Sequence, residues 1–367
     1  MARRPATLRR ACQLPSSQKS RVRRNRKLMK ISIIVLAYKH ERYVLEALRS
    51  AVGQTLKADE IIVIDDASPD ATPKIVEAFI RENPSAPLRL IRNERNLGVT
   101  GSFARAVAVA AGDVIFGLAG DDVSTPNRLK VVHDYLSSRP ATFAVVSNAL
   151  IIDETSSPSG MLDNCAGCLT PTALSVADLA PGEHFLRSRS SCGAAAAYRA
   201  EVFRSFSPLR DGLYAEDDPA AFRAMLLGTC DFLPEPLVHW RRHANNLSHG
   251  TGSRRGPEMA VHYRKCEAMV DQMIADAVEW KSRHEGRLGP GIDHAVSSLR
   301  FHKAKWALWA AAHEKGLSFA DFFSAAKDMA ERRTSLYEFM KETWRPAFRM
   351  FMPFPMQRFI ANFRSRP

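Results

Sequence analysis

Residues 31–66 read ISIIVLAYKHERYVLEALRSAVGQTLKADEIIVIDD, and their pattern indicates the fold class. The stretch begins and ends with short apolar runs, 31–36 and 61–64, that show no polar alternation. Such runs are typical of strands buried on both faces of a parallel sheet. Between them, apolar residues from Val44 to Val52 recur at helical spacing and stop at Gly53. The stretch therefore predicts a strand, a helix and a second strand in succession.

The same alternation continues along the chain. Elements in this order favour an α/β fold with a parallel, doubly wound sheet and helices on its faces. Beyond Gly256 the apolar spacing is helical, whereas residues 154–190, rich in Ser, Pro, Gly and Thr, are expected to form a long loop. The other expected elements are a helix within 71–83, a strand at 88–93, a helix at 101–113 closed by Gly112, and strands at 114–120 and 143–153.

The net charge of +13 is concentrated at the two ends of the chain. Residues 1–30 carry +11 and residues 341–367 carry +5, which leaves −3 for residues 31–340. A body that binds nucleic acid along a groove carries basic charge itself, so this distribution argues against a nucleic-acid partner. The six cysteines are scattered and no apolar leader is visible, which favours a reducing cytoplasm. The single CxxC pair, Cys165 and Cys168, lacks the second pair that a zinc site needs.

Polar side chains follow several of the expected strands, at the point where each strand ends. In open α/β sheets, ligands bind beyond these carboxyl ends. Adjacent carboxylates repel each other, so a pair of them implies a bound cation, a shared proton or exposure to water. The residues at the strand ends are Ala37 and Tyr38, Asp65 and Asp66, and Asp121 and Asp122.

Together with a later acidic cluster, these strand ends resemble the family-2 inverting glycosyltransferases of the GT-A fold. The resemblance covers about residues 30–250 and implies a GT-A domain at 29–250. A nucleotide-binding half would span about 29–130 and an acceptor half about 131–250, with a disordered basic arm at 1–28 and a helical region at 256–367. The matching stretches are ISIIVLAYKHERYVLEALRSAVGQT, EIIVIDDASPDAT, RNERNLGVTGSFARAVAVAAGDVIFGLAGDDVSTPNRL, YAEDDPAAFRAML and VHWRRHANNLS.

By this resemblance, Asp122 coordinates a divalent cation, Mg²⁺ or Mn²⁺, and Asp121 contacts the ribose or metal-bound water. A hard cation prefers carboxylate oxygens and stabilises the charge that grows on a leaving nucleoside diphosphate. Gly120 stands where many relatives have an outer aspartate, which leaves the number of ligands open.

The resemblance also implies the nucleotide contacts. Asp66 would accept from a base N–H, which selects uracil or thymine and hence a UDP- or dTDP-sugar. Asp65 either ties down the same turn or caps the next helix. Ala37 and Tyr38 would border the base, Lys39 replaces the commonest asparagine, and Arg105 either approaches the nucleotide or lies on a solvated helix face.

The catalytic base is expected among the three acids of AEDDPAAF. Glu216 and Asp217 match the family's acidic pair, in which the aspartate takes the acceptor proton and the glutamate supports it. Pro219 fits the first position of a helix, which would make Asp218 the N-cap. We therefore expect Asp217 to be the base, with Asp218 in a structural role.

The segment RRHANN offers further polar groups. His243 is a candidate ligand of the metal or the diphosphate, and equally a solvated histidine. Arg241 and Arg242 either neutralise phosphate with their forked donors or lie on the surface.

The combined reading is a metal-dependent inverting glycosyltransferase that moves a sugar to a hydroxyl of a glycan or lipid-linked acceptor, in polysaccharide or glycoconjugate synthesis. One rival is a nucleotidyltransferase, although the first strand lacks the glycine-rich loop of that class, and another is a catalytically inactive relative. The tail at 341–367 is basic and amphipathic. It would lie on the inner face of the cytoplasmic membrane, near lipid-linked acceptors, or pack on the domain or on a second copy in a homodimer.

Overall fold

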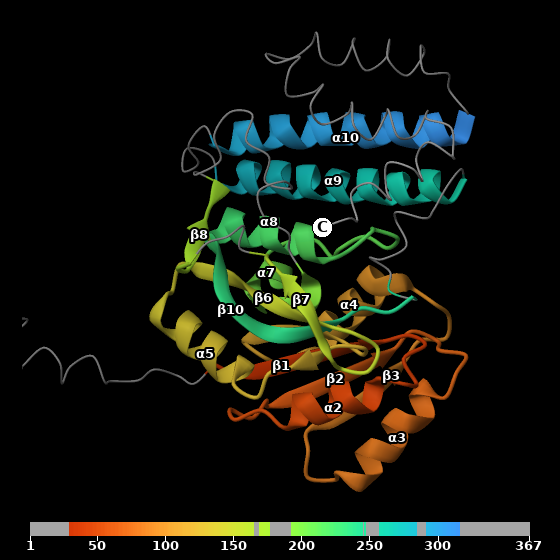
Figure 1. Ribbon diagram of the computed structural model, residues 1–367. Coiled ribbons are helices and arrows are strands. Elements are labelled where there is room, and N and C mark those ends of the chain that lie inside the picture. Colours follow the sequence, from red (N-terminus) through yellow and green to blue (C-terminus); the bar gives the residue numbers. More distant parts are fainter. Residues whose placement is uncertain are drawn as a thin grey trace, which may run out of the picture.

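The computed structural model describes residues 29–164, 169–176, 192–244, 246, 257–284 and 291–315. It is an α/β protein in which a long twisted sheet carries helices on both faces (Figure 1). The basic arm, the CxxC pair and the basic tail lie outside the described residues. Among the described helices, none is long and apolar enough to cross a membrane.

The secondary structure follows the alternation that the sequence predicts. In chain order the elements are β1 (Ile31–Ala37), α2 (Val44–Val52), β2 (Glu60–Asp65), α3 (Thr72–Glu82), β3 (Leu88–Arg92), α4 (Gly98–Val109), β4 (Val114–Ala119), β5 (Val123–Ser124), α5 (Arg128–Ser138), β6 (Thr142–Ile152), β7 (Pro158–Leu162), β8 (Thr172–Leu174), η2 (Gly193–Ala195), β9 (Ala196–Arg199), α7 (Glu201–Arg204), α8 (Asp217–Leu227), β10 (Thr229–Arg241), α9 (Pro257–Arg283) and α10 (Gly291–Lys315).

The described strands form one sheet in the order β3-β2-β1-β4-β9-β6-β10-β5, with β7 on β6 and β8 on β10. Strands β1 to β4 are parallel, β6 and β10 are parallel, and β9 runs antiparallel between β4 and β6. Chain order reverses at β1, since β2 lies on one side of it and β4 on the other. Such a switch point leaves a crevice beyond the strand ends, where doubly wound sheets bind their ligands.

Alternate residues of the strands build two separate cores. Ile33 and Val35 of β1 face α2, α3 and α5, while Ile34 faces the other side. There α4 and α8 cover the sheet, and α9 and α10 stack as successive layers over α8 (Figure 1). The C-terminal helices are therefore packed through α8 onto the same sheet as the strand ends.

Two expectations differ from the structure in detail, and one strand is irregular. The described part of 154–190 contains β7 and β8, so it is not a continuous loop. Helix α4 starts at Gly98, three residues before the expected start. Strand β10 passes through Pro234 and Pro236, which the ladder accommodates by shifting register at those positions.

A buried ion pair joins α8 to α9. Arg223 donates from Nε to Asp276 Oδ2 at 2.7 Å and from Nη2 to Asp276 Oδ1 at 2.9 Å. Both side chains are 1% exposed, and Gln272 adds a hydrogen bond to Asp276 Oδ1 at 2.8 Å. A charge left alone at such a site is costly, so the pair ties the two helices together.

We predict that Asp276→Ala lowers the free energy of unfolding by about 3–5 kcal/mol, because Arg223 is left buried without its counter-ion. Urea denaturation measures the change. The double variant Arg223→Met/Asp276→Leu should recover most of the loss, since neither charge remains. Asp134→Ala, which removes the exposed partner of Lys130, is the control and should change stability by about 0–1 kcal/mol. A loss in Asp276→Ala no larger than this control would contradict the prediction.

Candidate active site

Backbone hydrogen bonds join the ends of β1, β2 and β4. Asp66 N–H donates to Ala37 O at 2.9 Å, and Gly120 N–H donates to Leu36 O at 2.7 Å. A Cβ on Gly120 would lie 2.7 Å from the His40 ring and 3.0 Å from Leu36 O, so this close approach requires glycine. The polar residues after these strands therefore share one edge of the sheet, as the sequence predicts.

The turn after β4, Gly120–Asp122, is called the acidic turn below. Asp121 is buried, and its Oδ2 lies 2.9 Å from His243 Nε2, 3.2 Å from Asn246 Nδ2 and 3.6 Å from His40 Nε2. Burial opposes ionisation of Asp121, but the hydrogen bond from His243 and the charge of His40 outweigh it and lower the pKa of this carboxyl. Asp121 is therefore held as the ionised member of the pair.

Asp122 has the opposite environment. It is 1% exposed, and burial, followed by the charge of Asp121, raises its pKa well above the ordinary value. Its Oδ1 accepts the backbone N–H of Arg241 at 2.8 Å. Its Oδ2 is buried and has no hydrogen-bond partner among the described residues. A buried acceptor with no donor is costly, and this oxygen is where a cation would compensate.

Arg241, His243 and Asn246 contact the acidic turn. Asn246 donates from Nδ2 to Arg241 O at 3.0 Å and accepts the His243 N–H at its Oδ1. Arg241 is not on the surface: it is 1% exposed, and its guanidinium donates to protein acceptors rather than into open space. Arg242 is exposed and lies over the Trp240 ring.

Asp66 organises the neighbouring turn. Its carboxylate accepts from Asn93 Nδ2 and Leu97 N at 2.7 Å each, and from Gly98 N at 2.9 Å. Arg105 is exposed on α4 and donates to Asn93 Oδ1 at 2.7 Å. Asn93 in turn donates to Asp66, so Arg105 is linked to Asp66 through Asn93. Asp66 thus fixes the N-terminus of α4.

Its neighbour Asp65 ties down the turn after β2, because its Oδ2 accepts the Ser68 N–H at 3.1 Å. This contact matches the first of the two structural roles that the sequence leaves open for it.

The acidic cluster Glu216–Asp218 lies at the start of α8, which begins at Asp217 rather than at Pro219. Asp218 is therefore inside the first turn, and the expected N-cap role for it is wrong. Asp217 accepts the Asp218 N–H at its Oδ1 at 2.9 Å and the Gly193 N–H at its Oδ2 at 3.1 Å. The proline signal misleads because Pro219 is the third helical residue, where its missing N–H is still among the unpaired first-turn groups.

Burial and neighbouring negative charge raise the pKa values of Glu216 and Asp217 at the α8 start. Removal from water, followed by the charges of Asp218 and Glu216, raises the pKa of Asp217 well above its ordinary value. Burial, with a further contribution from Asp218, raises the pKa of Glu216 to about 7. A carboxylate with a raised pKa is a stronger base when it is ionised.

The turn at Cys192 and Gly193 lies between the two acidic groups. Burial, followed by the charges of Asp122 and Asp217, raises the pKa of the Cys192 thiol to about 12. A Cβ on Gly193 would overlap the Glu216 carboxylate, and a Cβ on Gly117 of β4 would lie 2.5 Å from Gly193 O. The turn can pass between the β4 strand and the α8 start only because both positions are glycine.

A buried arginine supports this arrangement and was not singled out from the sequence. Arg128 donates to Gly117 O at 2.9 Å, Ala196 O at 3.0 Å and Ser124 Oγ at 3.1 Å. Burial lowers its pKa to about 10. The only sequence signal was an arginine at the start of an amphipathic helix, a position that is usually solvated.

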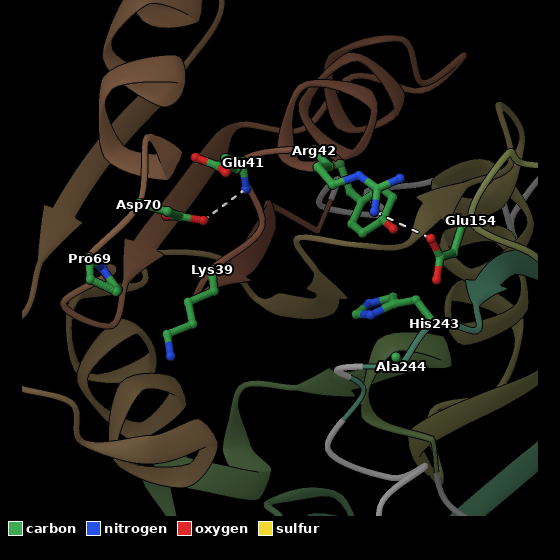
Figure 2. Close-up of a pocket in the computed structure, with 9 residues that line it drawn as sticks. Lys39, Glu41, Arg42, Pro69, Asp70, Glu154, His243 and Ala244 are labelled. Atoms are coloured by element: carbon green, nitrogen blue, oxygen red, sulfur yellow. Dashed lines mark hydrogen bonds and ion pairs between the residues drawn. The ribbon is translucent and has the colours of Figure 1, made fainter.

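A cleft of about 450 Å³ opens beside the acidic turn (Figure 2). His243 connects the two, because it lines the cleft and contacts Asp121. Lys39 adopts φ 58°, a conformation that asparagine tolerates better than lysine. Two contacts visible in Figure 2 fix the walls, Arg42 with Glu154 at 3.3 Å and the Glu41 N–H with Asp70 at 3.3 Å. The lining residues are Lys39, Glu41, Arg42, Tyr43, Pro69, Asp70, Glu154, His243 and Ala244.

The available side chains limit the kind of metal site that the protein could form. The described residues contain no group of three or more His, Cys, Asp or Glu side chains placed to hold an ion. The unpartnered Oδ2 of Asp122 nevertheless fits a hard cation that takes its remaining oxygens from a diphosphate and water. The residues present therefore fit a substrate-bridged ion better than a closed structural site.

Comparison with known proteins supports the fold and the family. Residues 32–204 match glycosyl transferase family 2. This part of the chain, from β1 to α7, is similar to that family. The uncharacterized protein Rv1520 of Mycobacterium tuberculosis is 27% identical over 302 residues, covering 76% of this chain and 84% of its own. An uncharacterized glycosyltransferase of Haemophilus influenzae is 28% identical over 222 residues, covering 59% of this chain and 67% of its own.

A solved structure shows the same fold. TarS of S. aureus, residues 1–349 in complex with UDP-GlcNAc, superposes with a TM-score of 0.53 at 17% identity, covering 83% of this chain and 81% of the TarS chain. The likeness establishes the GT-A architecture, a mostly parallel sheet flanked by helices with further helices at the C-terminus.

We predict that Asp122→Asn loses the Mn²⁺-dependent stabilisation by UDP, because the amide keeps the Arg241 contact at Oδ1 but removes the anionic oxygen. In EDTA the variant should melt at or above the temperature of the wild type, since a buried carboxyl no longer has to ionise. Thermal melts with UDP, with and without Mn²⁺, measure both effects. Undiminished Mn²⁺-dependent UDP affinity would count against the assignment of Asp122.

Proposed function

We propose that this protein is an inverting glycosyltransferase that uses a UDP- or dTDP-sugar and transfers the sugar to a hydroxyl of a glycan or lipid-linked acceptor. One observation carries the proposal. The acidic turn, with one unpartnered carboxylate oxygen, and the acidic start of α8 lie on either side of the Cys192–Gly193 turn in a family-2 fold. An inverting transfer needs these two groups, one for the leaving diphosphate and one for the attacking hydroxyl.

On the donor side, Asp122 would hold Mg²⁺ or Mn²⁺ through Oδ2, and the ion would stabilise negative charge on the leaving diphosphate. Asp121, fixed by His243 and Asn246, is proposed to contact the ribose or water bound to the ion. Ala37, Tyr38 and Asp66 are proposed to contact the base. Asp66 already accepts three hydrogen bonds and presents its carboxylate at a fixed position. The UDP-GlcNAc complex of TarS is consistent with a uridine donor.

On the acceptor side, Asp217 would take the proton of the attacking hydroxyl. The Gly193 N–H fixes its Oδ2, and its raised pKa suits it to accept a proton. Glu216, buried next to it, would keep that pKa raised through its own charge. Arg105 lies beside Asn93 and Asp66, where its charge would face the nucleotide.

The donor is tested by thermal melts of the wild type with UDP, dTDP, GDP and ADP, each with and without Mn²⁺. We expect UDP or dTDP with Mn²⁺ to raise the melting temperature, because a ligand bound only by the folded state stabilises it by mass action. GDP and ADP should have little effect. Equal protection by all four, or protection by an oligonucleotide instead, would refute the proposed donor class.

The base is tested by Asp217→Asn, which should leave donor binding intact while transfer falls by a factor of ~10² or more. Asp218→Asn is the matched control and should keep most of the rate. Glu216→Gln removes a negative neighbour and so lowers the pKa of Asp217. Because the base must be ionised, the rising limb of the pH–rate profile should move to lower pH in this variant. If Asp218→Asn loses the rate and Asp217→Asn keeps it, the base is Asp218.

A further inference from the structure

The last residue of β10 contacts both aspartates of the acidic turn. The backbone N–H of Arg241 donates to Asp122 Oδ1 at 2.8 Å, and its side-chain Nε donates to the backbone carbonyl of Asp121 at 2.8 Å. Neither contact uses the Asp122 Oδ2 atom. Arg241 therefore fixes one oxygen of the Asp122 carboxylate and the backbone beside it, and leaves the other oxygen open.

The far end of the same side chain is anchored in two other elements. Nη1 donates to Asp153 O at 3.0 Å and to Ser156 Oγ at 2.9 Å, both in the turn between β6 and β7. Nη2 donates to Glu46 Oε2 at 2.5 Å on α2, and the guanidinium carbon lies 4.8 Å from the centre of the Tyr43 ring. A single side chain thus joins β10, the acidic turn, the β6–β7 turn and α2.

The Arg241 side chain is buried, and its contacts hold it in one position. Its side chain is 1% exposed, while that of its ion-pair partner Glu46 is 46% exposed. A buried guanidinium is tolerated when its donors are satisfied in one geometry. The guanidinium of Arg241 donates to four protein acceptors, which leaves little of the fork for a phosphate.

We propose that Arg241 is a positioning residue that orients the Asp122 carboxylate toward the cation, rather than a phosphate ligand. This rests on the proposed function. The backbone N–H that donates to Asp122 Oδ1 belongs to Arg241, the last residue of β10. The next backbone N–H, that of Arg242, donates to Ile152 O of β6 at 2.8 Å and not to the acidic turn. Without the guanidinium, nothing on the side chain of residue 241 holds that N–H against Asp122, and the carboxylate can turn.

The consequence is a loss of cation affinity without the loss of any cation ligand. Groups that orient a ligating carboxylate typically change metal affinity by about 10–100-fold when they are removed. The affinity for UDP in the absence of metal should not change, because Arg241 is not proposed to touch the nucleotide. A purely structural role would lower the melting temperature but leave the Mn²⁺ affinity of the folded protein unchanged.

The test compares Arg241→Met and Arg241→Lys with the wild type, and uses the adjacent exposed Arg242→Met as the control. The probe is Mn²⁺, titrated into protein with saturating UDP and followed by the electron paramagnetic resonance signal of free Mn²⁺. We expect Arg241→Met to weaken Mn²⁺ binding by about 10-fold or more. Arg241→Lys, which keeps the charge near Glu46 without the fork, should recover part of it. Arg242→Met should match the wild type.

Wild-type Mn²⁺ affinity in folded Arg241→Met would overturn the proposal while leaving the proposed function intact. If Arg241→Met does not fold, Glu46→Gln and Ser156→Ala release the far end of the side chain instead. Weakened Mn²⁺ binding in either supports the proposal, and unchanged binding in both overturns it. A wild type with no Mn²⁺-dependent UDP binding would overturn the cation half of the proposed function together with this inference.

Discussion

The repulsion between Asp121 and Asp122 is the constraint around which the rest of the site is arranged. Both carboxylates are buried at the end of β4, so water does little to screen the repulsion between them. Burial opposes ionisation of both, but His243 and His40 outweigh it at Asp121 and lower the pKa there, whereas burial and the charge of Asp121 raise the pKa of Asp122. An arrangement that leaves one carboxylate oxygen without a donor costs stability in the free protein. Under the proposed function, a cation that arrives with the substrate would offset this cost.

The opposite acidic group is built by the same principle with different parts. Glu216, Asp217 and Asp218 crowd the first turn of α8, where the helix dipole offsets part of their repulsion. Among the described residues, Asp217 accepts hydrogen bonds from the backbone N–H groups of Gly193 and Asp218. Burial and the charges of Asp218 and Glu216 outweigh the lowering effect of these two N–H groups, so the pKa of Asp217 is raised, whereas the histidines beside Asp121 outweigh its burial and lower the pKa there. The contrast between Asp121 and Asp217 is thus a contrast between a group fixed as an anion and a group able to take a proton.

The sequence predicted the parts of this arrangement that depend on local pattern. Continuous apolar runs such as Ile61–Ile64 and the acids that follow them indicated the parallel sheet, its helices and the edge that carries the site. What the sequence did not predict depends on contacts between distant segments. Arg241 and Arg223 look like surface arginines by composition, and only the fold shows that each is buried against partners 195 and 53 residues away. The start of α8 was misplaced because a proline is compatible with several first-turn positions.

The position of Asp217 also explains how the C-terminal helices bear on the site. Asp217 lies at the first residue of α8, and Arg223 lies on the same helix where it pairs with Asp276 of α9. The Arg223–Asp276 pair therefore joins α9 to the helix that begins at the acidic cluster. The acidic turn, by contrast, is positioned by β10 through Arg241. The acidic turn is thus held by the buried Arg241, and the helix that carries Asp217 is joined to α9 by the buried Arg223, on either side of the Cys192–Gly193 turn.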